Sequence, residues 1–142
     1  MTEQELIKTA RSFVDAFNDN DWDRAASLLT PNAIYNEVGT QRRVQGAAEI
    51  VQGIQSWKEA MPDVKGTVTN AFANTNRAVL EITWEGTHTG PLAGPGGTIP
   101  ASGKRPVTPS AFIFDFVGDR IKETRNYFDM LSFLQQIGEV PH

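Results

Sequence analysis

The sequence predicts one α+β domain, in which helices in the first part of the chain pack on an antiparallel sheet made by the second part. Apolar residues follow a 3.6-residue period in the segments that lead up to Met61, and they alternate with polar residues after Pro62. Separate runs of helices and strands are typical of α+β folds. The length of 142 residues is common for one domain, and no linker or internal repeat divides residues 1–142.

Three helices are expected in the first part of the chain. Thr2 and Glu5 have the spacing of a capping box, which indicates that the first helix begins there. Asp21 can cap a short second helix, because its side chain can accept a hydrogen bond from the backbone of the first turn. A third helix is expected over residues 46–61, and Pro62 stops it.

Five strands are expected, one between the second and third helices and four in the second half. They cover residues 33–38, 65–73, 77–88, 106–117 and 120–129, and a last helix follows at 130–137. Gly118 and Asp119 between the last two strands indicate a two-residue hairpin turn. Residues 89–104 form a long loop rich in glycine and proline, and such a loop inside a small domain is usually functional or mobile.

The hairpin turn predicts which residues of the last two strands face each other. A two-residue turn places Val117 opposite Arg120, so Asp115 faces Lys122 as a favourable pair of opposite charges. The face that should be buried then holds Phe112, Phe114, Phe116, Glu123, Arg125, Tyr127 and Asp129. A β-bulge would reverse this assignment, because it moves each later side chain to the other face of the sheet.

Asp129 is the candidate for proton transfer. A carboxylate buried among aromatic rings has a raised pKa unless it is paired, and a raised pKa suits a general acid or base near neutral pH. Asp129 also directly precedes the last helix, where it could be an N-cap that contributes about 1 kcal/mol. The spacing alone favours this structural role.

Other residues on inward faces are candidates for substrate binding. Glu123 and Arg125 can form a structural ion pair, or Arg125 can anchor a carbonyl or carboxylate of the ligand while Glu123 holds it. Trp84 and His88 share the inward face of their strand, so His88 is expected at the inner edge beside the long loop. It could act as a base, as a hydrogen-bond donor or as an ordinary histidine. Trp57, like the other large aromatic residues, is most often a core residue.

The composition argues against several other functions. The absence of cysteine excludes disulfides and thiolate metal sites, and two histidines without a ligand pair at helical spacing make a metal site improbable. Thirteen basic and seventeen acidic residues, with no basic cluster, argue against nucleic acid as a partner. Neither a membrane span nor a secretory signal is recognisable, so we expect a cytoplasmic protein.

Four short motifs occur in a fixed order along the chain. They are MPD at residues 61–63, WEGTHTG at 84–90, IKE at 121–123 and QQIG at 135–138. With this order and spacing, the chain resembles the SnoaL-like polyketide cyclase family of the NTF2-like superfamily over nearly its whole length. It differs on the first strand, where many relatives carry a histidine and this chain reads Tyr35-Asn36-Glu37.

The resemblance implies a cone-shaped NTF2-like (cystatin-like) fold, with N-terminal helices on a strongly curved antiparallel sheet around an internal pocket. It also implies a cofactor-independent enzyme that closes a ring by an intramolecular aldol step on a hydrophobic carbonyl substrate. Asp129 matches the general acid/base of the family, and His88 matches a histidine near the edge of the pocket. The expected substrate-binding residues are Arg125, Tyr127, Glu123, Trp84, Phe112, Phe114, Tyr35 and Trp57.

Two alternatives use the same fold. The first is a non-catalytic protein that binds a small ligand without changing it. The second is an isomerase or a hydrolase, the latter with a water molecule held by Asp129 and by Tyr35 or Asn36. The superfamily further implies a homodimer, for which the outer face of the sheet offers Ala111, Ile113 and Val117.

Overall fold

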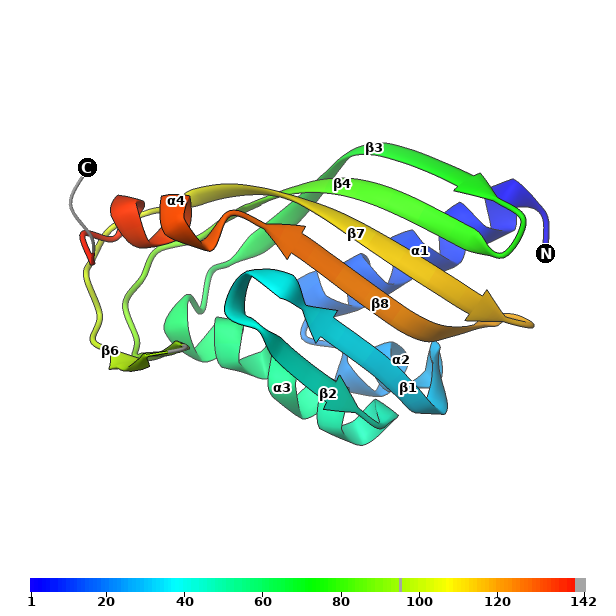
Figure 1. Ribbon diagram of the computed structural model, residues 1–142, viewed down its shortest axis with the longest axis horizontal. Helices are drawn as coiled ribbons and strands as arrows, with labels where there is room; N and C mark the ends of the chain where they lie inside the picture. The colour runs from blue at the N-terminus through cyan, green and yellow to red at the C-terminus, as the bar shows by residue number, and fades with distance from the viewer. Residues whose placement is uncertain (95, 140–142) are drawn as a thin grey trace.

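The computed structural model describes residues 1–94 and 96–139, and helices pack on one face of a six-stranded sheet (Figure 1). The helices are α1 (Glu3–Asn18), α2 (Trp22–Ser27), α3 (Ala47–Ala60) and α4 (Met130–Gln136). The strands are β1 (Leu29–Glu37), β2 (Arg42–Gln45), β3 (Lys65–Asn74), β4 (Arg77–Glu85), β5 (Leu92–Gly94), β6 (Gly97–Ile99), β7 (Val107–Val117) and β8 (Arg120–Phe128). The predicted α+β class is confirmed.

The caps predicted for the first two helices are confirmed. The Thr2 side chain accepts a hydrogen bond from the Glu5 backbone, and the Glu5 carboxylate accepts one from the Thr2 backbone. Asp21 caps α2 by accepting from the backbone N–H of Arg24 at 3.2 Å. These side chains satisfy N–H groups that have no partner inside the helix. The buried face of α1 consists of Leu6, Ala10, Phe13, Val14, Ala16 and Phe17, and it packs against β3 and β4.

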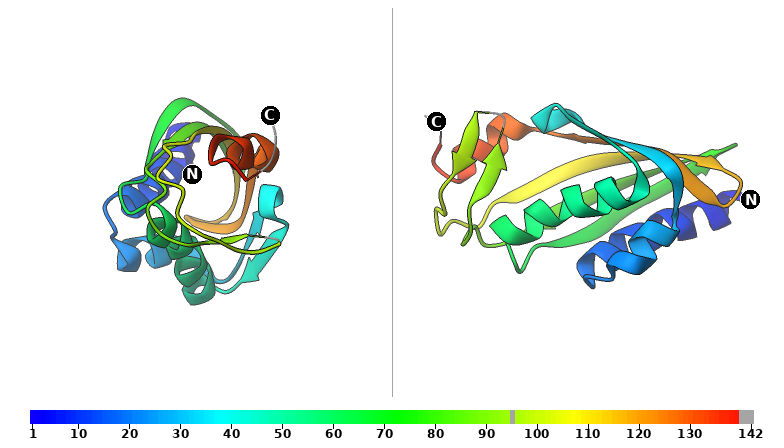
Figure 2. Two further views of the ribbon diagram at one scale, coloured as in Figure 1. Left: turned by 90° about the vertical axis from the view of Figure 1, so that its left-hand side faces the viewer. Right: turned by 90° about the horizontal axis from the view of Figure 1, so that it is seen from below.

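The strands of the main sheet lie in the order β2-β1-β8-β7-β4-β3, and only the β1–β8 pair is parallel. The sheet curves strongly, so that its concave face wraps around α1 and α3 (Figure 2). Three strands and one short 3₁₀ helix, η1 (Val38–Thr40), were not predicted. The four residues of β2 are too few to give a clear alternating pattern, and β5 and β6 form a small hairpin inside the long loop.

The β7–β8 hairpin turns where the sequence predicts it, with Gly118 at a φ of 58°. The two pairs of opposing residues next to the turn also agree with the prediction. Beyond them the register shifts by one residue, so that Asp115 faces Glu123. The predicted pairing of Asp115 with Lys122 is therefore wrong, because β8 contains a bulge at this point.

The bulge reverses which side chains of β8 face the interior. Thr124 and Asn126 are buried, whereas Glu123 and Arg125 lie half-buried on the outer face and Tyr127 is 43% exposed. The predicted inward placement of Glu123, Arg125 and Tyr127 is wrong. The observed register avoids the cost of burying charge, since the two charged side chains can pair and still reach water.

The three phenylalanines of β7 point inwards as predicted. Phe112, Phe114 and Phe116 are each no more than 5% exposed, and they pack under the helices.

Within the described residues, no helix is long and apolar enough to cross a membrane.

Candidate ligand-binding cavity

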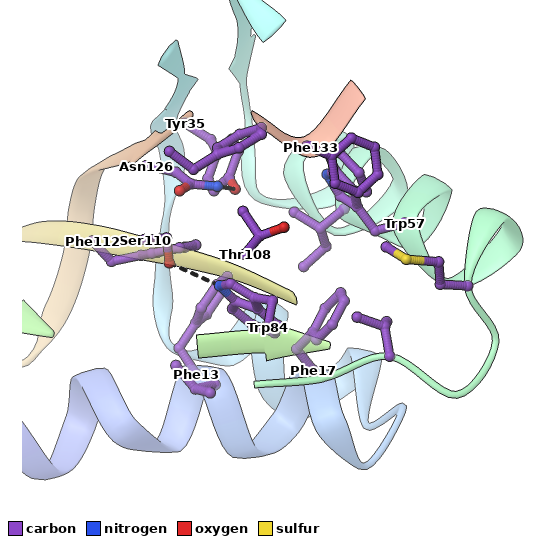
Figure 3. A pocket seen from close by; sticks show the side chains of 15 residues that line it. Phe13, Phe17, Tyr35, Trp57, Trp84, Thr108, Ser110, Phe112, Asn126 and Phe133 are labelled. Carbon is purple, nitrogen blue, oxygen red and sulfur yellow. Dashed lines mark hydrogen bonds between the residues drawn. The ribbon is translucent and has the colours of Figure 1, made fainter. Parts of the chain in front are cut away.

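A cavity of about 80 Å³ lies between the concave face of the sheet and helices α1, α3 and α4 (Figure 3). A single buried water requires roughly 15 Å³, so the space is large enough for a small organic molecule. The lining residues are Phe13, Val14, Phe17, Tyr35, Ile54, Trp57, Met61, Val64, Trp84, Thr108, Ser110, Phe112, Asn126, Phe128 and Phe133.

The walls of the cavity are mainly aromatic rings that hold one another in place. The ring of Trp57 meets Phe128 and Phe133 edge to face, with centroids 5.9 and 5.6 Å apart. On the opposite side, the rings of Trp84 and Phe17 also meet edge to face, with their centroids 5.3 Å apart. Such pairs are favourable beyond the area that they bury. The cavity is therefore shaped before any ligand enters.

Two hydroxyl groups of β7 lie on the cavity wall. Ser110 is satisfied, because its oxygen accepts from Trp84 Nε1 at 2.9 Å and its O–H donates to the carbonyl of Ile82 at 3.1 Å. The hydroxyl of Thr108 points towards the middle of the cavity (Figure 3), and it has no hydrogen-bond partner among the described residues. Thr108 is thus an available donor or acceptor for a ligand.

Tyr35 from β1 and Asn126 from β8 form a second polar position on the wall. Asn126 Nδ2 donates to the Tyr35 hydroxyl oxygen at 3.2 Å, and that hydroxyl donates to Glu37 Oε2 at 3.5 Å. The other end of the amide, Asn126 Oδ1, is buried and has no partner within the described part of the chain. A buried acceptor without a partner costs roughly 1–3 kcal/mol of stability.

Glu37 is a buried carboxylate directly behind this wall. It is 1% exposed, and it accepts hydrogen bonds from Trp57 Nε1 at 2.9 Å, from Thr40 Oγ1 at 2.7 Å and from Arg42 at 3.0 Å. Charge-assisted hydrogen bonds of this kind are short and directional. Glu37 therefore fixes both Trp57 and Tyr35, although it does not itself line the cavity.

The phenol of Tyr35 stays neutral in this environment. Burial raises the pKa of Tyr35 far above its usual value, and the negative charge of Glu37 raises it further. The hydrogen bond from Asn126 and the charge of Arg42 oppose this increase but do not outweigh it. Tyr35 is the one titratable residue among the described lining residues, so the cavity wall carries no charge near neutral pH.

The predicted binding residues Glu123 and Arg125 form an ion-pair cluster on the outer face of the sheet. Arg125 contacts Asp115 at 2.7 Å and Glu123 at 3.0 Å, and Asp115 also pairs with Arg77. The hydrogen bond to Asp115 raises the pKa of Arg125 despite partial burial. The geometry thus agrees with the structural ion pair, on the face that points away from the cavity.

Asp129 lies at the surface, and the prediction that it points into the pocket is wrong. Its carboxylate accepts a hydrogen bond from the backbone N–H of Ser132 at 3.0 Å and so caps α4. It is exposed and does not line the cavity. The N-cap alternative is confirmed.

His88 lies beside the long loop, as predicted, but it does not line the cavity. Its ring is fully buried, and Nδ1 accepts from the backbone N–H of Ser102 at 3.2 Å. The His88 backbone also donates to the carbonyl of Lys104 at 2.8 Å. Burial lowers the pKa of His88, although Glu139 and Gly90 act in the opposite direction. In this structure the residue ties residues 102–104 to the end of β4.

Four of the predicted binding residues do come together at the cavity: Tyr35, Trp57, Trp84 and Phe112. Phe114 does not line the cavity, since it is fully buried and packs on Phe13 at 6.1 Å between ring centroids. Sequence analysis missed Asn126 as a candidate because its inward position depends on the bulge. Glu37 had a signal that was not used: it shares the inward alternation of Ala33 and Tyr35.

Comparisons with known proteins agree with this architecture. The family model described as SnoaL-like polyketide cyclase matches residues 7–137, which is most of the chain. No match was found among curated proteins.

Several solved structures share the fold. A candidate SnoaL-like polyketide cyclase from Jannaschia sp. CCS1 superposes with a TM-score of 0.86 at 20% identity, covering 98% of this chain and 95% of that one. TsrD from Streptomyces laurentii superposes with a TM-score of 0.84 at 21% identity, and the alignment covers 99% of each chain. An LEH-like epoxide hydrolase from M. tuberculosis superposes with a TM-score of 0.73 at 18% identity, covering 95% of this chain and 90% of that one. Another similar structure, from Catenulispora acidiphila, is described as having a ketosteroid isomerase-like fold. Because ketosteroid isomerases have the NTF2-like fold, the expected fold is confirmed.

Proposed function

Because the chain belongs to the SnoaL-like polyketide cyclase family, we propose that its cavity binds a small, neutral, largely apolar molecule that carries an oxygen. The observation that carries this proposal is the wall itself, which is mainly aromatic and holds no charged group among the described lining residues. Small-molecule sites typically combine apolar walls with a few convergent polar groups. Here those groups are the hydroxyl of Thr108 and the linked pair of Tyr35 and Asn126.

The neutrality of the wall limits the ligand. A charged ligand buried in this cavity would lose its hydration without gaining an opposite charge, which costs several kcal/mol. A neutral ring system loses little favourable hydration when it is buried, and it gains contact with the edges and faces of Trp57, Trp84 and the phenylalanines. The ligand oxygen would then be held by the hydroxyl of Thr108.

The experiment uses naphthalene as a neutral apolar probe and a matched pair of variants. Val64→Phe places a ring in the cavity, whereas Val117→Phe makes the same change on a side chain that is 56% exposed at the β7–β8 turn. Naphthalene should raise the Tm of the wild type and of Val117→Phe, because a ligand that binds only the folded state stabilises it. The Tm of Val64→Phe should not respond. An unchanged wild-type Tm, or an equal response in both variants, contradicts the proposal.

A second candidate is catalysis of the ring closure that the family suggests, and the family match over residues 7–137 favours it. In that case Asp129 would transfer the proton, as the resemblance implies, and His88 would donate a hydrogen bond to the substrate oxygen. Asp129 would have to leave its position as the cap of α4, and His88 would have to leave Ser102. Asp129→Asn separates the two candidates, because it removes the acid but keeps the cap. Loss of turnover on a carbonyl substrate with unchanged probe binding would support catalysis.

We also propose that the outer face of the sheet forms a homodimer. Ala111 and Ile113 lie there beside the Arg125 cluster, and Val117 is exposed at the end of β7. Ile113→Asp would place a new charge in that interface. Size-exclusion chromatography with light scattering should give a dimer for the wild type and a monomer for the variant, and a monomeric wild type refutes the proposal.

A further inference from the structure

The cavity lies at the end of the sheet where the segment between β4 and β7 leaves and returns, which Figure 1 shows beside β6 and α4. Several lining residues stand at or next to the end of their own helix or strand on this side: Phe17, Met61, Trp84, Thr108 and Phe128. Directly after β4, Gly86 packs on Val64 so closely that a Cβ there would lie 2.8 Å from the Val64 Cα. The segment therefore lies directly against the cavity wall.

Two stretches of this segment, residues 87–90 and 102–105, pair with each other and are called the clasp below. The backbone N–H of His88 donates to the carbonyl of Lys104, and the N–H of Gly103 donates to the carbonyl of His88, both at 2.8 Å. The clasp thus continues the pairing of β4 with β7 beyond the end of the sheet and keeps the two stretches together.

The contacts of the His88 ring within the clasp require its neutral form. Nδ1 accepts from the backbone N–H of Ser102 at 3.2 Å and lies 2.8 Å from the hydroxyl oxygen of the same residue. A backbone N–H can only donate, so Nδ1 carries no proton and the ring proton is on Nε2. A second proton, on Nδ1, would face the Ser102 N–H and would place a positive charge on a ring that is 0% exposed. Nε2 has no partner among the described residues, so no hydrogen bond there offsets this cost.

From this geometry, and resting on the proposed function of the cavity, we propose that protonation of His88 opens the clasp and so regulates how fast a ligand enters and leaves. The protonated ring leaves Ser102, and residues 102–105 separate from residues 87–90. Gly86 can then move away from Val64, which lines the cavity. His88 controls access in this way without contacting the ligand.

The other charged groups near the clasp leave this role to His88. On the elements around it these residues are Glu59, Asp63, Glu85, Lys104, Arg105 and Glu139. Arg105 pairs with Asp63 at 2.9 Å and with Glu85 at 3.9 Å. The hydrogen bond from the Thr87 backbone keeps the pKa of Asp63 below its usual value, so Asp63 stays charged while His88 titrates. Burial lowers the pKa of His88, and the charge of Glu139 opposes this decrease without outweighing it.

Hydrogen–deuterium exchange measured by mass spectrometry tests the opening without any ligand. Because a solvated histidine has a pKa of about 6.5, the open fraction should rise up to about tenfold between about pH 7.5 and about pH 5.5, after correction for the intrinsic exchange rate. His88→Asn keeps an acceptor for the Ser102 N–H but does not titrate, so its corrected exchange over residues 102–105 should be equal at both pH values. The same pH dependence in the wild type and in His88→Asn overturns the inference.

The release of naphthalene, followed by stopped-flow tryptophan fluorescence, connects the opening with the cavity. In the wild type the release rate should rise by the same factor as the open fraction, and in His88→Asn it should stay constant. If the clasp opens at low pH but the release rate does not change, the clasp does not control access and the inference is wrong. If naphthalene binds at neither pH, the proposed function fails and this regulation fails with it, whereas the exchange rates still decide whether protonation opens the clasp.

The NMR spectrum of the imidazole nitrogens examines the wild type directly and decides the matter if His88→Asn does not fold. The chain has only two histidines, which makes the signals of His88 simple to assign. At about pH 7.5 the proton should be on Nε2, with Nδ1 unprotonated. A proton on Nδ1 at this pH overturns the inference, because the ring could then keep its place in the clasp only without the Ser102 N–H.

Discussion

Replacing Glu37 with glutamine should destabilise the protein far more than the same replacement of a surface glutamate. The carboxylate of Glu37 is 1% exposed and takes hydrogen bonds on both oxygens. Glutamine has the same shape but only one acceptor oxygen, so its NH₂ group must face at least one of the donors from Trp57, Thr40 or Arg42. Arg42 also loses the charge that it pairs with at 3.0 Å.

The expected loss is about 3 kcal/mol in the free energy of unfolding. Removing one partner of a buried ion pair typically costs roughly 3–5 kcal/mol. The lower end applies here, because the side chain of Arg42 is 30% exposed and can turn towards water. For a chain of this length, about 3 kcal/mol corresponds to a decrease in Tm of about 10 °C.

Urea denaturation followed by tryptophan fluorescence and circular dichroism measures this loss directly. Glu123→Gln is the matched control, since Glu123 also pairs with an arginine, but on the outer face where both side chains are 32% and 21% exposed. Exposed pairs contribute less than about 1 kcal/mol, and Arg125 keeps Asp115 as a partner. Equal losses in the two variants, or a loss below about 1 kcal/mol for Glu37→Gln, would refute the structural role assigned to Glu37.

Further predictions concern Asp129 and His88. Asp129→Ala should lower the free energy of unfolding by about 1 kcal/mol in urea titrations, while Asp129→Asn should not, because asparagine is an equally good N-cap; equal losses would mean that the carboxylate does more than cap α4. Burial lowers the pKa of folded His88 below its usual value of about 6.5, so the unfolded chain binds the proton first and stability should fall as the pH decreases from about 7 to 5. His88→Asn keeps an acceptor for the Ser102 N–H and does not titrate, so its Tm should change less over this range; an identical pH dependence would show that other groups cause it. Burial raises the pKa of Asp115, but the hydrogen bonds from Arg77 and Arg125 outweigh it, so the net pKa lies below the usual value. The stability that Asp115 contributes should therefore be lost in urea titrations as the pH falls through this lowered pKa, below the range in which His88 acts.

Periodicity and local capping predicted the elements of this fold because both depend on neighbours in the sequence. The capping box of Thr2 and Glu5 and the cap at Asp21 need only three or four residues to be recognised. The turn at Gly118 likewise follows from local backbone preferences. The parallel contact of β1 with β8 could not be predicted in this way, since it joins segments about ninety residues apart.

The candidate site was predicted only where it does not depend on the bulge in β8. Tyr35, Trp57 and Trp84 come from other elements, and each lines the cavity. On β8 the sequence pattern is compatible with two registers. The register without a bulge is disfavoured, because it would bury the charge of Arg125 among phenylalanines. With the bulge, Asn126 takes the inward position.

The bulge also means that β8 has one residue more than regular pairing with β7 requires, and Lys122 is that extra residue. Deleting Lys122 would leave the same residues opposite each other, with Asp115 facing Glu123 and Phe112 facing Asn126. The uncharged interior would therefore survive this one-codon deletion, although a one-residue shift in a regular strand exchanges its two faces. At this position the length of the strand can change without altering the cavity wall.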